Sequence, residues 1–162
     1  MKPFIGTFIN KVDGKGRLSV PARWRAVVAE GSFPGIVCYP SFKAGTIEGV
    51  TMERMEELAT LIDDAFDPFA DGQDAFATSI LADAFELPFD GDGRIVLPEE
   101  LMAHADIVDR AAFVGLGRRF QIWEPEAYAR VRDELREQAF VQRASLKARA
   151  RPAARPAPEG TP

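Results

Sequence analysis

A nine-residue segment occurs twice in the chain, 77 positions apart, and constrains the fold more than any other sequence feature. Residues 13–21 read Asp-Gly-Lys-Gly-Arg-Leu-Ser-Val-Pro, and residues 90–98 read Asp-Gly-Asp-Gly-Arg-Ile-Val-Leu-Pro. Five of the nine positions are identical, and two others exchange one apolar residue for another. Because a fixed offset indicates duplication of a structural unit, we predict two copies of one unit of about 75 residues.

Both copies show the same predicted order: strand, glycine-rich loop, strand, short helix, two strands and a closing helix. Glycines between short alternating runs are typical of a β-hairpin, and the proline that ends each motif suits the first turn of a helix. The expected elements lie at 8–12, 18–20, 22–29, 35–39, 46–50 and 52–66, and then at 99–105, 112–116, 120–123 and 126–140 or beyond. This order predicts a mainly β fold with peripheral helices (α+β), and it disfavours a parallel nucleotide-binding sheet.

Composition sets the expected boundaries. Residues 67–74 contain the Pro, Gly and Asp of a linker, so the first half is placed at 1–74 and the second at 75–142. Residues 143–162 form a basic Ala/Pro/Arg tract with few large apolar groups. Such a tract cannot bury enough surface to offset its ordering entropy, so it is predicted to be disordered.

The net charge of −5 is unevenly distributed. Residues 1–30 carry six Lys/Arg against two Asp/Glu, whereas residues 31–109 carry three against seventeen. Residues 143–162 are basic again, with five against one. Nucleic-acid binding depends on the face that meets the phosphates rather than on the total charge. The first thirty residues are therefore the candidate binding face.

The first motif places Lys15 and Arg17 on a tight turn inside this basic segment. Gly14 and Gly16 allow the backbone to approach a ligand closely, and an arginine fork can hold phosphate or a guanine edge through two bonds. This arrangement suits DNA, with Lys11, Arg23 and Arg25 as further candidates near the same end. In the alternative interpretation, Asp13 and Arg17 simply clamp the turn and the lysine is solvated. Both interpretations fit the spacing. The phosphate-binding loop of an NTPase is disfavoured, because this segment lacks the upstream glycine spacing of that loop and the Ser/Thr that follows its lysine.

The second motif has Asp92 in place of the lysine, so Asp90 and Asp92 flank Gly91. Paired carboxylates could bind Mg²⁺ or Ca²⁺, but no further oxygen ligands follow at calcium-loop spacing. We therefore expect turn-forming aspartates, with Gly91 and Gly93 shaping the loop and Arg94 as the counterpart of the first arginine.

The sequence predicts no enzyme, no metal site and no cofactor. One cysteine, Cys38, and one histidine, His104, leave no set of zinc ligands, and no serine lies in a nucleophile elbow. No small-molecule substrate is expected. No apolar run approaches the roughly 20 residues that span a bilayer, and the first residues lack the apolar region of a signal peptide. We expect a cytoplasmic protein without membrane contact.

Trp24 lies between two arginines, where it could stack on a base. Burial in a core or a subunit contact is the commoner fate of tryptophan, and we predict it here. The apolar residues of the helices at 52–66 and 126–140 have two candidate uses, the intrachain core and an interface between subunits.

The chain resembles the MraZ family of bacterial transcriptional regulators, which are associated with the division and cell-wall gene cluster. The segments that carry the resemblance are 12–25, 97–98, 113–117 and 120–125, and it extends over about residues 4–140. It implies two AbrB-like (SpoVT-type) swapped-hairpin halves that form a pseudo-dimeric β-barrel. It also implies rings of eight or twelve subunits that bind short tandem promoter repeats of their own operon and associate with the nucleoid.

The same resemblance implies that DNA is contacted by Asp13, Lys15 and Arg17 in the first copy and by Asp90 and Arg94 in the second. We expect the lysine and Arg17 to contact DNA while Asp13 holds the loop. Residues 79–85, before the second motif, are uncharged or acidic where many family members are rich in arginine. The expected function is repression by occlusion of the promoter. The alternative, motivated by the acidic middle of the chain, is a ring-forming interaction protein without DNA specificity.

Overall fold

The computed structural model describes residues 1–42, 45–65, 67, 69 and 71–150, without the side chains of 147–150. The contacts divide the chain into a unit that ends at Tyr128 and a second unit that begins at Ala129. Within the described residues no helix is long and apolar enough to cross a membrane.

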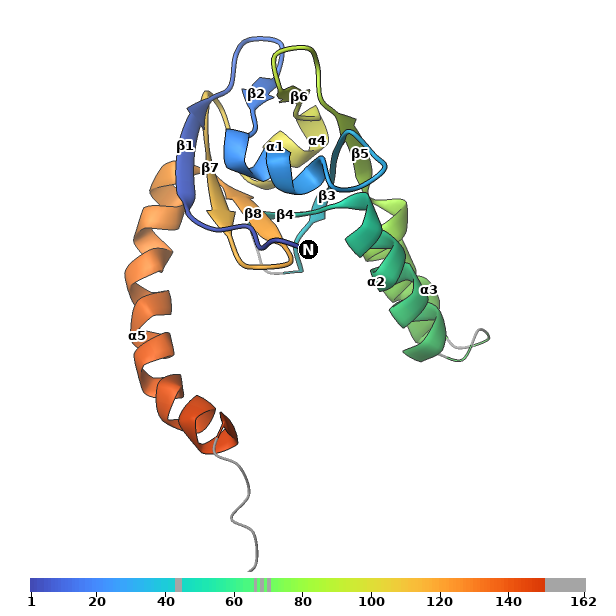
Figure 1. Ribbon diagram of the computed structural model, residues 1–162, viewed down its shortest axis with the longest axis vertical. Coiled ribbons are helices and arrows are strands. Elements are labelled where there is room, and N and C mark those ends of the chain that lie inside the picture. Colours follow the sequence, from blue (N-terminus) through green and yellow to red (C-terminus); the bar gives the residue numbers. More distant parts are fainter. Residues whose placement is uncertain (43–44, 66, 68, 70, 151–162) are drawn as a thin grey trace, which may run out of the picture. The chain divides into compact units, whose positions relative to one another are not determined.

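The first unit contains the two predicted copies, each with the order strand, strand, helix, strand, strand, helix (Figure 1). The first copy consists of β1 (Thr7–Lys11), β2 (Arg17–Ser19), α1 (Ala22–Val28), β3 (Gly35–Pro40), β4 (Ile47–Val50) and α2 (Met52–Ala65). The second consists of β5 (Phe85–Pro88), β6 (Arg94–Val96), α4 (Glu99–His104), β7 (Arg110–Gly115), β8 (Phe120–Trp123) and the start of α5 (Pro125–Ala150). The predicted order and the α+β class are confirmed.

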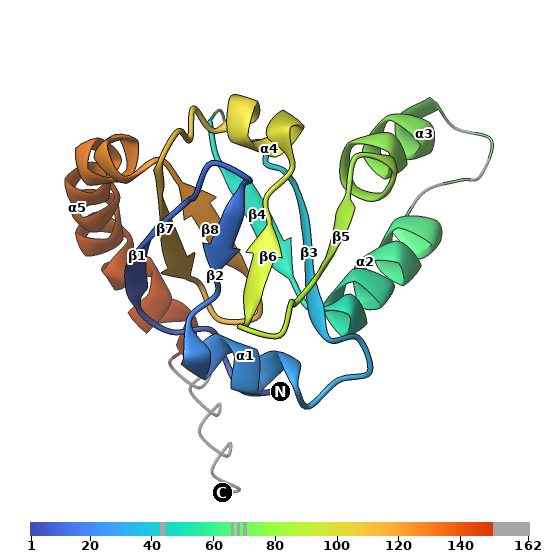
Figure 2. The same cartoon turned by 90° about the horizontal axis from the view of Figure 1, so that it is seen from above.

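The two copies exchange strands. Six strands form an antiparallel sheet in the order β1-β7-β8-β4-β3-β5, and β2 pairs with β6 in a separate two-stranded sheet. The first strand of each copy pairs with the third strand of the other, while the second strands pair with each other and the fourth strands do the same. The pairing is therefore pseudo-two-fold symmetric, as swapped halves require. Figure 2 shows β2 and β6 lying across one face of the larger sheet.

This exchange changes the predicted hairpin in each copy. Instead of pairing along their length, β1 and β2 are joined by a single bridge between Val12 and Leu18. Each strand then leaves for a partner from the other copy. The glycine-rich segment is consequently a loop between two sheets. Both loops stand at the top of the unit in Figure 1, one at each end of the antiparallel β2–β6 pair.

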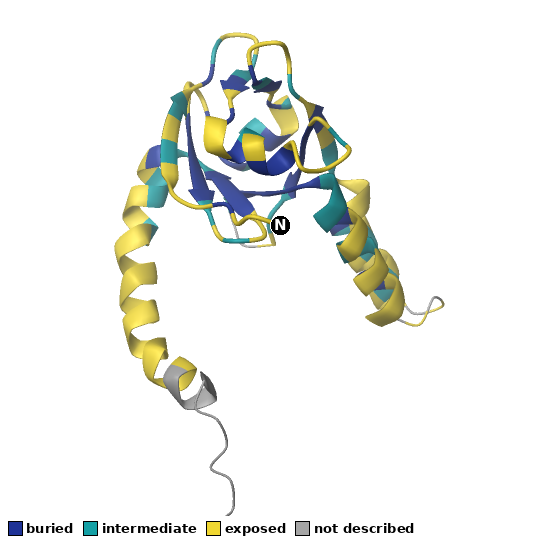
Figure 3. Ribbon diagram, in the orientation of Figure 1, coloured by how far each residue is buried: buried dark blue, intermediate teal, exposed yellow. Residues whose placement is uncertain are grey.

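The main core lies between the two sheets and α1, where buried residues concentrate in Figure 3. Trp24 is 1% exposed and stands among Phe4, Phe113 and Phe120, with ring centroids 5.1–5.5 Å away. Its indole Nε1 donates to the carbonyl oxygen of Ile5 at 3.0 Å. The prediction of a core position for this tryptophan is confirmed, so it does not stack on a base.

A smaller core covers the other face of β3 and β4. Met55 and Ile62 of α2 pack there against Val37 and Val50 of the sheet, together with Ile80. Met55 and Ile62 thus have the first of the two candidate uses, the intrachain core, whereas Leu61 of the same helix is 53% exposed.

The predicted linker contains more structure than expected. Residues 71–74 begin a helix, α3 (Asp71–Ala77), which continues into a π-helical turn, η1 (Thr78–Ala82). Two aspartates in the first turn of α3 complement the helix dipole, and Ile80 of η1 is buried in the smaller core. The start of the second copy is therefore tied to the sheet rather than loosely connected.

The last helix, α5, starts at Pro125, and the carboxylate of Glu124 caps it by accepting from the amides of residues 126 and 127 at 3.0 and 2.7 Å. The helix extends through residue 150, which includes the first eight residues of the predicted tail. Ala, Lys, Arg and Leu are strong helix formers and account for this extension. The remaining tail residues, 151–162, lie outside the described part of the chain.

Candidate nucleic-acid interface

The first loop is closed by one aspartate. Asp13 Oδ1 accepts hydrogen bonds from the backbone amides of Lys15 and Arg17, both at 2.9 Å, and its Oδ2 pairs with Arg17 Nε. Gly16 adopts a φ of 79°, which favours glycine, and its amide donates to the carbonyl oxygen of Asp13 at 3.0 Å. The clamp that sequence offered as the alternative to DNA contact is therefore present. It fixes the loop without covering the cations, because Lys15 is exposed and the Arg17 side chain is 36% exposed.

The second loop repeats this geometry atom for atom. Asp90 Oδ1 accepts from the amides of Asp92 and Arg94 at 2.9 Å, and Asp90 Oδ2 pairs with Arg94 Nε at 2.9 Å. Gly93 has a φ of 74°. One contact is added, because Asp92 Oδ2 lies 3.2 Å from Arg94 Nη2. Both predicted aspartates therefore form the turn.

The loops are joined across the pseudo-two-fold axis. The carbonyl oxygen of Gly16 accepts from the amide of Leu97 at 2.8 Å, and that of Gly93 accepts from the amide of Val20 at 3.2 Å. Each loop is thus held both by its own aspartate and by the chain that follows the other loop. The result is a fixed pair of turns, one at each end of the β2–β6 pair.

Charge distinguishes the two loops. With Asp13, Lys15 and Arg17, the first carries one net positive charge. With two aspartates and Arg94, the second carries one net negative charge. Within the described residues Arg17 has one ion pair, whereas Arg94 has two. The first loop can therefore offer cationic donors to an anion, while the second already satisfies its arginine internally.

The remaining predicted cations do not all gather at the first loop. Lys11 ends β1 two residues before Asp13 and is exposed, and Arg23 is exposed on α1. Arg25 instead packs its guanidinium against Gly93 of the second loop and donates through Nε to the carbonyl oxygen of Val20 at 3.2 Å. Arg25 therefore supports the second loop, which sequence spacing could not indicate.

The structure adds one cation that the sequence analysis missed. Arg110 begins β7 and lies directly opposite Lys11 in the β1–β7 register. The amide of Val12 donates to the carbonyl oxygen of Asp109 at 2.8 Å, so this strand start is fixed at the base of the first loop. No local sequence signal marks this arginine, because its position depends on a strand pairing between the two copies.

The Asp13 carboxylate should keep the loop in one conformation across the neutral range. Hydrogen bonding from the Arg17 amide, with further bonding from that side chain and the Lys15 amide, holds the Asp13 pKa below its ordinary value of 3.8. The clamp is therefore complete above that value and is lost only as the pH falls through the lower folded pKa. We expect the amide proton shifts of Lys15 and Arg17 in NMR spectra to stay constant from about pH 8 to 5 and to move below about pH 4. Movement near neutral pH would contradict this account, and Asp13→Asn at pH 7 provides the neutral-state reference.

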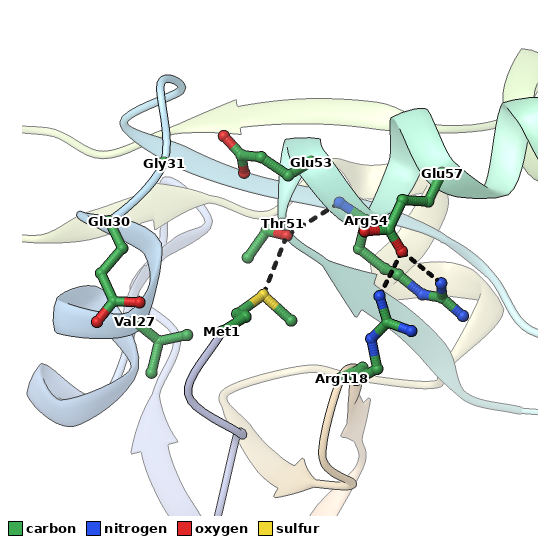
Figure 4. A pocket seen from close by; sticks show the side chains of 9 residues that line it. All are labelled: Met1, Val27, Glu30, Gly31, Thr51, Glu53, Arg54, Glu57 and Arg118. Carbon is green, nitrogen blue, oxygen red and sulfur yellow. Dashed lines mark hydrogen bonds and ion pairs between the residues drawn. The ribbon is translucent and has the colours of Figure 1, made fainter.

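A second polar cluster lies away from the loops and forms a shallow pocket between α1, α2 and the β7–β8 turn (Figure 4). Glu57 pairs there with Arg54 and Arg118, and Glu53 accepts from the amide of Ser32 at 2.8 Å. Two arginines thus neutralise Glu57, whereas Glu53 is held by a backbone amide. Among the described residues no group of three or more His, Cys, Asp or Glu side chains is placed to hold a metal ion.

Fold and site together define a class: a duplicated, strand-exchanged α+β protein that presents two aspartate-clamped turns, one of them cationic. A family model described as "MraZ protein, putative antitoxin-like" matches residues 80–149. Transcriptional regulator MraZ of Pelagibacter ubique (strain HTCC1062) is 44% identical over 144 residues, which cover 89% of this chain and 92% of that protein. The protein of the same name from Rickettsia akari (strain Hartford) is 40% identical over 147 residues, covering 91% and 98%. The chain belongs to the MraZ family.

Proposed function

We propose that the protein is a sequence-specific DNA-binding transcriptional regulator and that the first loop is its principal DNA contact. The observation that carries this proposal is the Asp13 clamp, which presents Lys15 and Arg17 to solvent on a fixed turn. Membership of a family whose curated members are named transcriptional regulators supports it. The clamp lowers the entropy lost on binding, because the loop is ordered before DNA arrives.

Each residue of the loop has a distinct role in this proposal. Arg17 uses Nε for the clamp, and in this proposal its two terminal nitrogens contact a base edge or a phosphate. Lys15 supplies a point charge to the backbone. Asp13 does not contact DNA itself but holds Lys15 and Arg17 in position. Lys11 and Arg23 add phosphate attraction, and Arg94 and Arg25 act mainly within the second loop.

A single loop discriminates only weakly between DNA sequences. A bidentate arginine contributes about 1–3 kcal/mol of base discrimination. If several identical subunits form a ring of eight or twelve and engage tandem promoter repeats, avidity increases by about 10²–10⁴ without new contacts. We propose this assembly, with repression of the division and cell-wall cluster by occlusion of its promoter and with nucleoid association as the cellular consequence.

Titration of two labelled duplexes tests the proposal. One carries the chain's own upstream DNA, the other a scrambled sequence of equal composition, and fluorescence anisotropy is measured at two salt concentrations. Preference for the upstream duplex, increasing with the number of repeats, supports the regulator. Equal and strongly salt-dependent binding to both would leave only non-specific phosphate attraction and favour the interaction-ring alternative, which native mass spectrometry of the free protein would then address.

The charge difference between the loops predicts a gain of affinity. In Asp92→Lys, the second loop acquires the lysine of the first and Arg94 loses one of its two ion pairs. We expect binding to upstream DNA to strengthen by about threefold or more and the salt dependence to steepen by about one unit for each contacting subunit. Asp64→Lys at the end of α2 changes the net charge equally and should leave both quantities near wild type. Equal effects of the two variants would show that only total charge matters.

A further inference from the structure

Two cations face each other beside the first loop. Lys11 and Arg110 are Cα partners in the antiparallel β1–β7 pair, and both are exposed. Side chains directly opposite in such a pair have Cβ atoms about 4.5–5.5 Å apart and lie on the same face of the sheet. Their charged ends can therefore reach one common ligand.

This pairing opposes folding rather than aiding it. Like charges directly opposite in a sheet are destabilising. Within the described residues neither Lys11 nor Arg110 forms an ion pair, although Asp109 is the next residue along the chain. The main core and the β1–β7 hydrogen bonds do not require charge at either position, so the arrangement suits a bound anion.

The equivalent position in the other half of the sheet shows that the fold does not require charged residues there. In the β5–β3 pair, which corresponds to β1–β7, the equivalent partners are Pro88 and Gly35. Both are uncharged. The β1–β7 side of the unit, which carries the positive loop, therefore also carries the cationic pair, whereas the β5–β3 side, which carries the loop with Asp92, has no such pair.

We propose that Lys11 and Arg110 form a backbone-phosphate site that continues the first loop, so that the DNA strand runs over the β1–β7 side of the molecule and not over the β5–β3 side. This inference rests on the proposed function. Lys15 and Arg17 lie four and six residues beyond Lys11 in the chain, and the backbone bond from Val12 to Asp109 joins loop and pair. The pair binds phosphate irrespective of sequence, and Arg17 supplies the selectivity.

Arg110→Glu tests the proposal because its expected effects on binding and on folding have opposite signs. The substitution replaces a like-charge pair with an opposite-charge pair, so the thermal midpoint of the free protein should equal or exceed that of wild type. Binding to the upstream and the scrambled duplex should weaken together, by about fivefold or more, with a salt slope lower by about one unit for each contacting subunit. Arg110→Lys should retain most of the affinity.

Controls separate this site from total charge and from the proposed function. Arg110→Gln is compared with Arg118→Gln, which removes the same charge from the turn at the other end of β7. Only Arg110→Gln should lower the affinity for DNA.

Unchanged affinity in Arg110→Glu, or loss of affinity together with a lower thermal midpoint, would overturn the phosphate site. If the wild type prefers the upstream duplex and substitutions at position 110 do not change the affinity, the proposed regulator function is supported and this phosphate site is refuted. Absence of any preference in wild type would refute the regulator. Arg110→Glu that binds DNA normally but no longer binds an acidic peptide would assign the pair to a protein partner instead.

Discussion

Arg17→Ala is expected to abolish preference for the upstream DNA while leaving the protein folded. The side chain is 36% exposed, and its ion pair with Asp13 is of a kind that contributes little to stability. The Asp13 carboxylate would still accept the backbone amides of residues 15 and 17, so the turn itself survives. The loss of discrimination should amount to about 1–3 kcal/mol for each contacting loop and should multiply across a ring.

Arg94→Ala is the matched control for this variant, because it removes the same group from the same position of the second loop. Arg94 already pairs with both Asp90 and Asp92, so its removal should cost much less affinity. Electrophoretic mobility shifts on the upstream duplex, with the thermal midpoint of each variant measured in parallel, compare the two. A larger loss in Arg94→Ala than in Arg17→Ala would reverse the assignment of the two loops.

Trp24→Ala is expected to have the largest effect on stability. The indole is 1% exposed, contacts three phenylalanine rings of the main core and donates one hydrogen bond to the Ile5 carbonyl. Truncation of a buried aromatic side chain typically costs about 3–5 kcal/mol, because it removes apolar burial and leaves a cavity. The same change also frees the carbonyl of Ile5 and loosens the N-terminal segment that precedes β1.

The midpoint of urea unfolding measures this effect. Trp24→Phe keeps much of the ring packing and should cost considerably less, since it loses mainly the indole hydrogen bond and part of the volume. A cost below about 1 kcal/mol for Trp24→Ala would contradict the central position of this residue in the core. Any loss of DNA binding in Trp24→Ala should follow the fraction of unfolded protein, because the ring lies in the core and not on the surface.

The order of the elements could be predicted from sequence because turn and helix signals are local. The two Asp-Gly-x-Gly-Arg segments marked both loops, and the prolines at 21 and 98 marked the starts of α1 and α4. Strand pairing could not be predicted in this way, because it depends on residues far apart in the sequence. A hairpin between β1 and β2 satisfies the same pattern, and only the burial of both copies in a common core selects β7 for β1 and β6 for β2. The predicted linker at 67–74 did not anticipate the start of α3 at Asp71, because Asp and Gly suit a linker as well as a first helical turn.

The candidate site likewise has one part that could be predicted from local sequence and another that could not. Asp13, Lys15 and Arg17 lie within five residues of one another, so their association could be predicted from spacing alone. Arg25 and Arg110 reach the loops only through the strand exchange between the copies. The charge difference between the loops was visible in the sequence as Asp92, but its consequence for Arg94 required the geometry of the second turn.

Photo-crosslinking tests most directly whether the first loop touches the DNA that the protein selects. Gly14 and Gly91 occupy equivalent positions, and a Cβ atom added at either would meet no atom within 4 Å. A photo-crosslinking amino acid can therefore be introduced at each position without a clash at its Cβ atom. We expect the probe at position 14 to crosslink to the upstream duplex, to be competed by unlabelled upstream DNA and not by scrambled DNA, and to give a higher yield than position 91. Absence of crosslinks at position 14, or equal competition by both duplexes, would contradict the account.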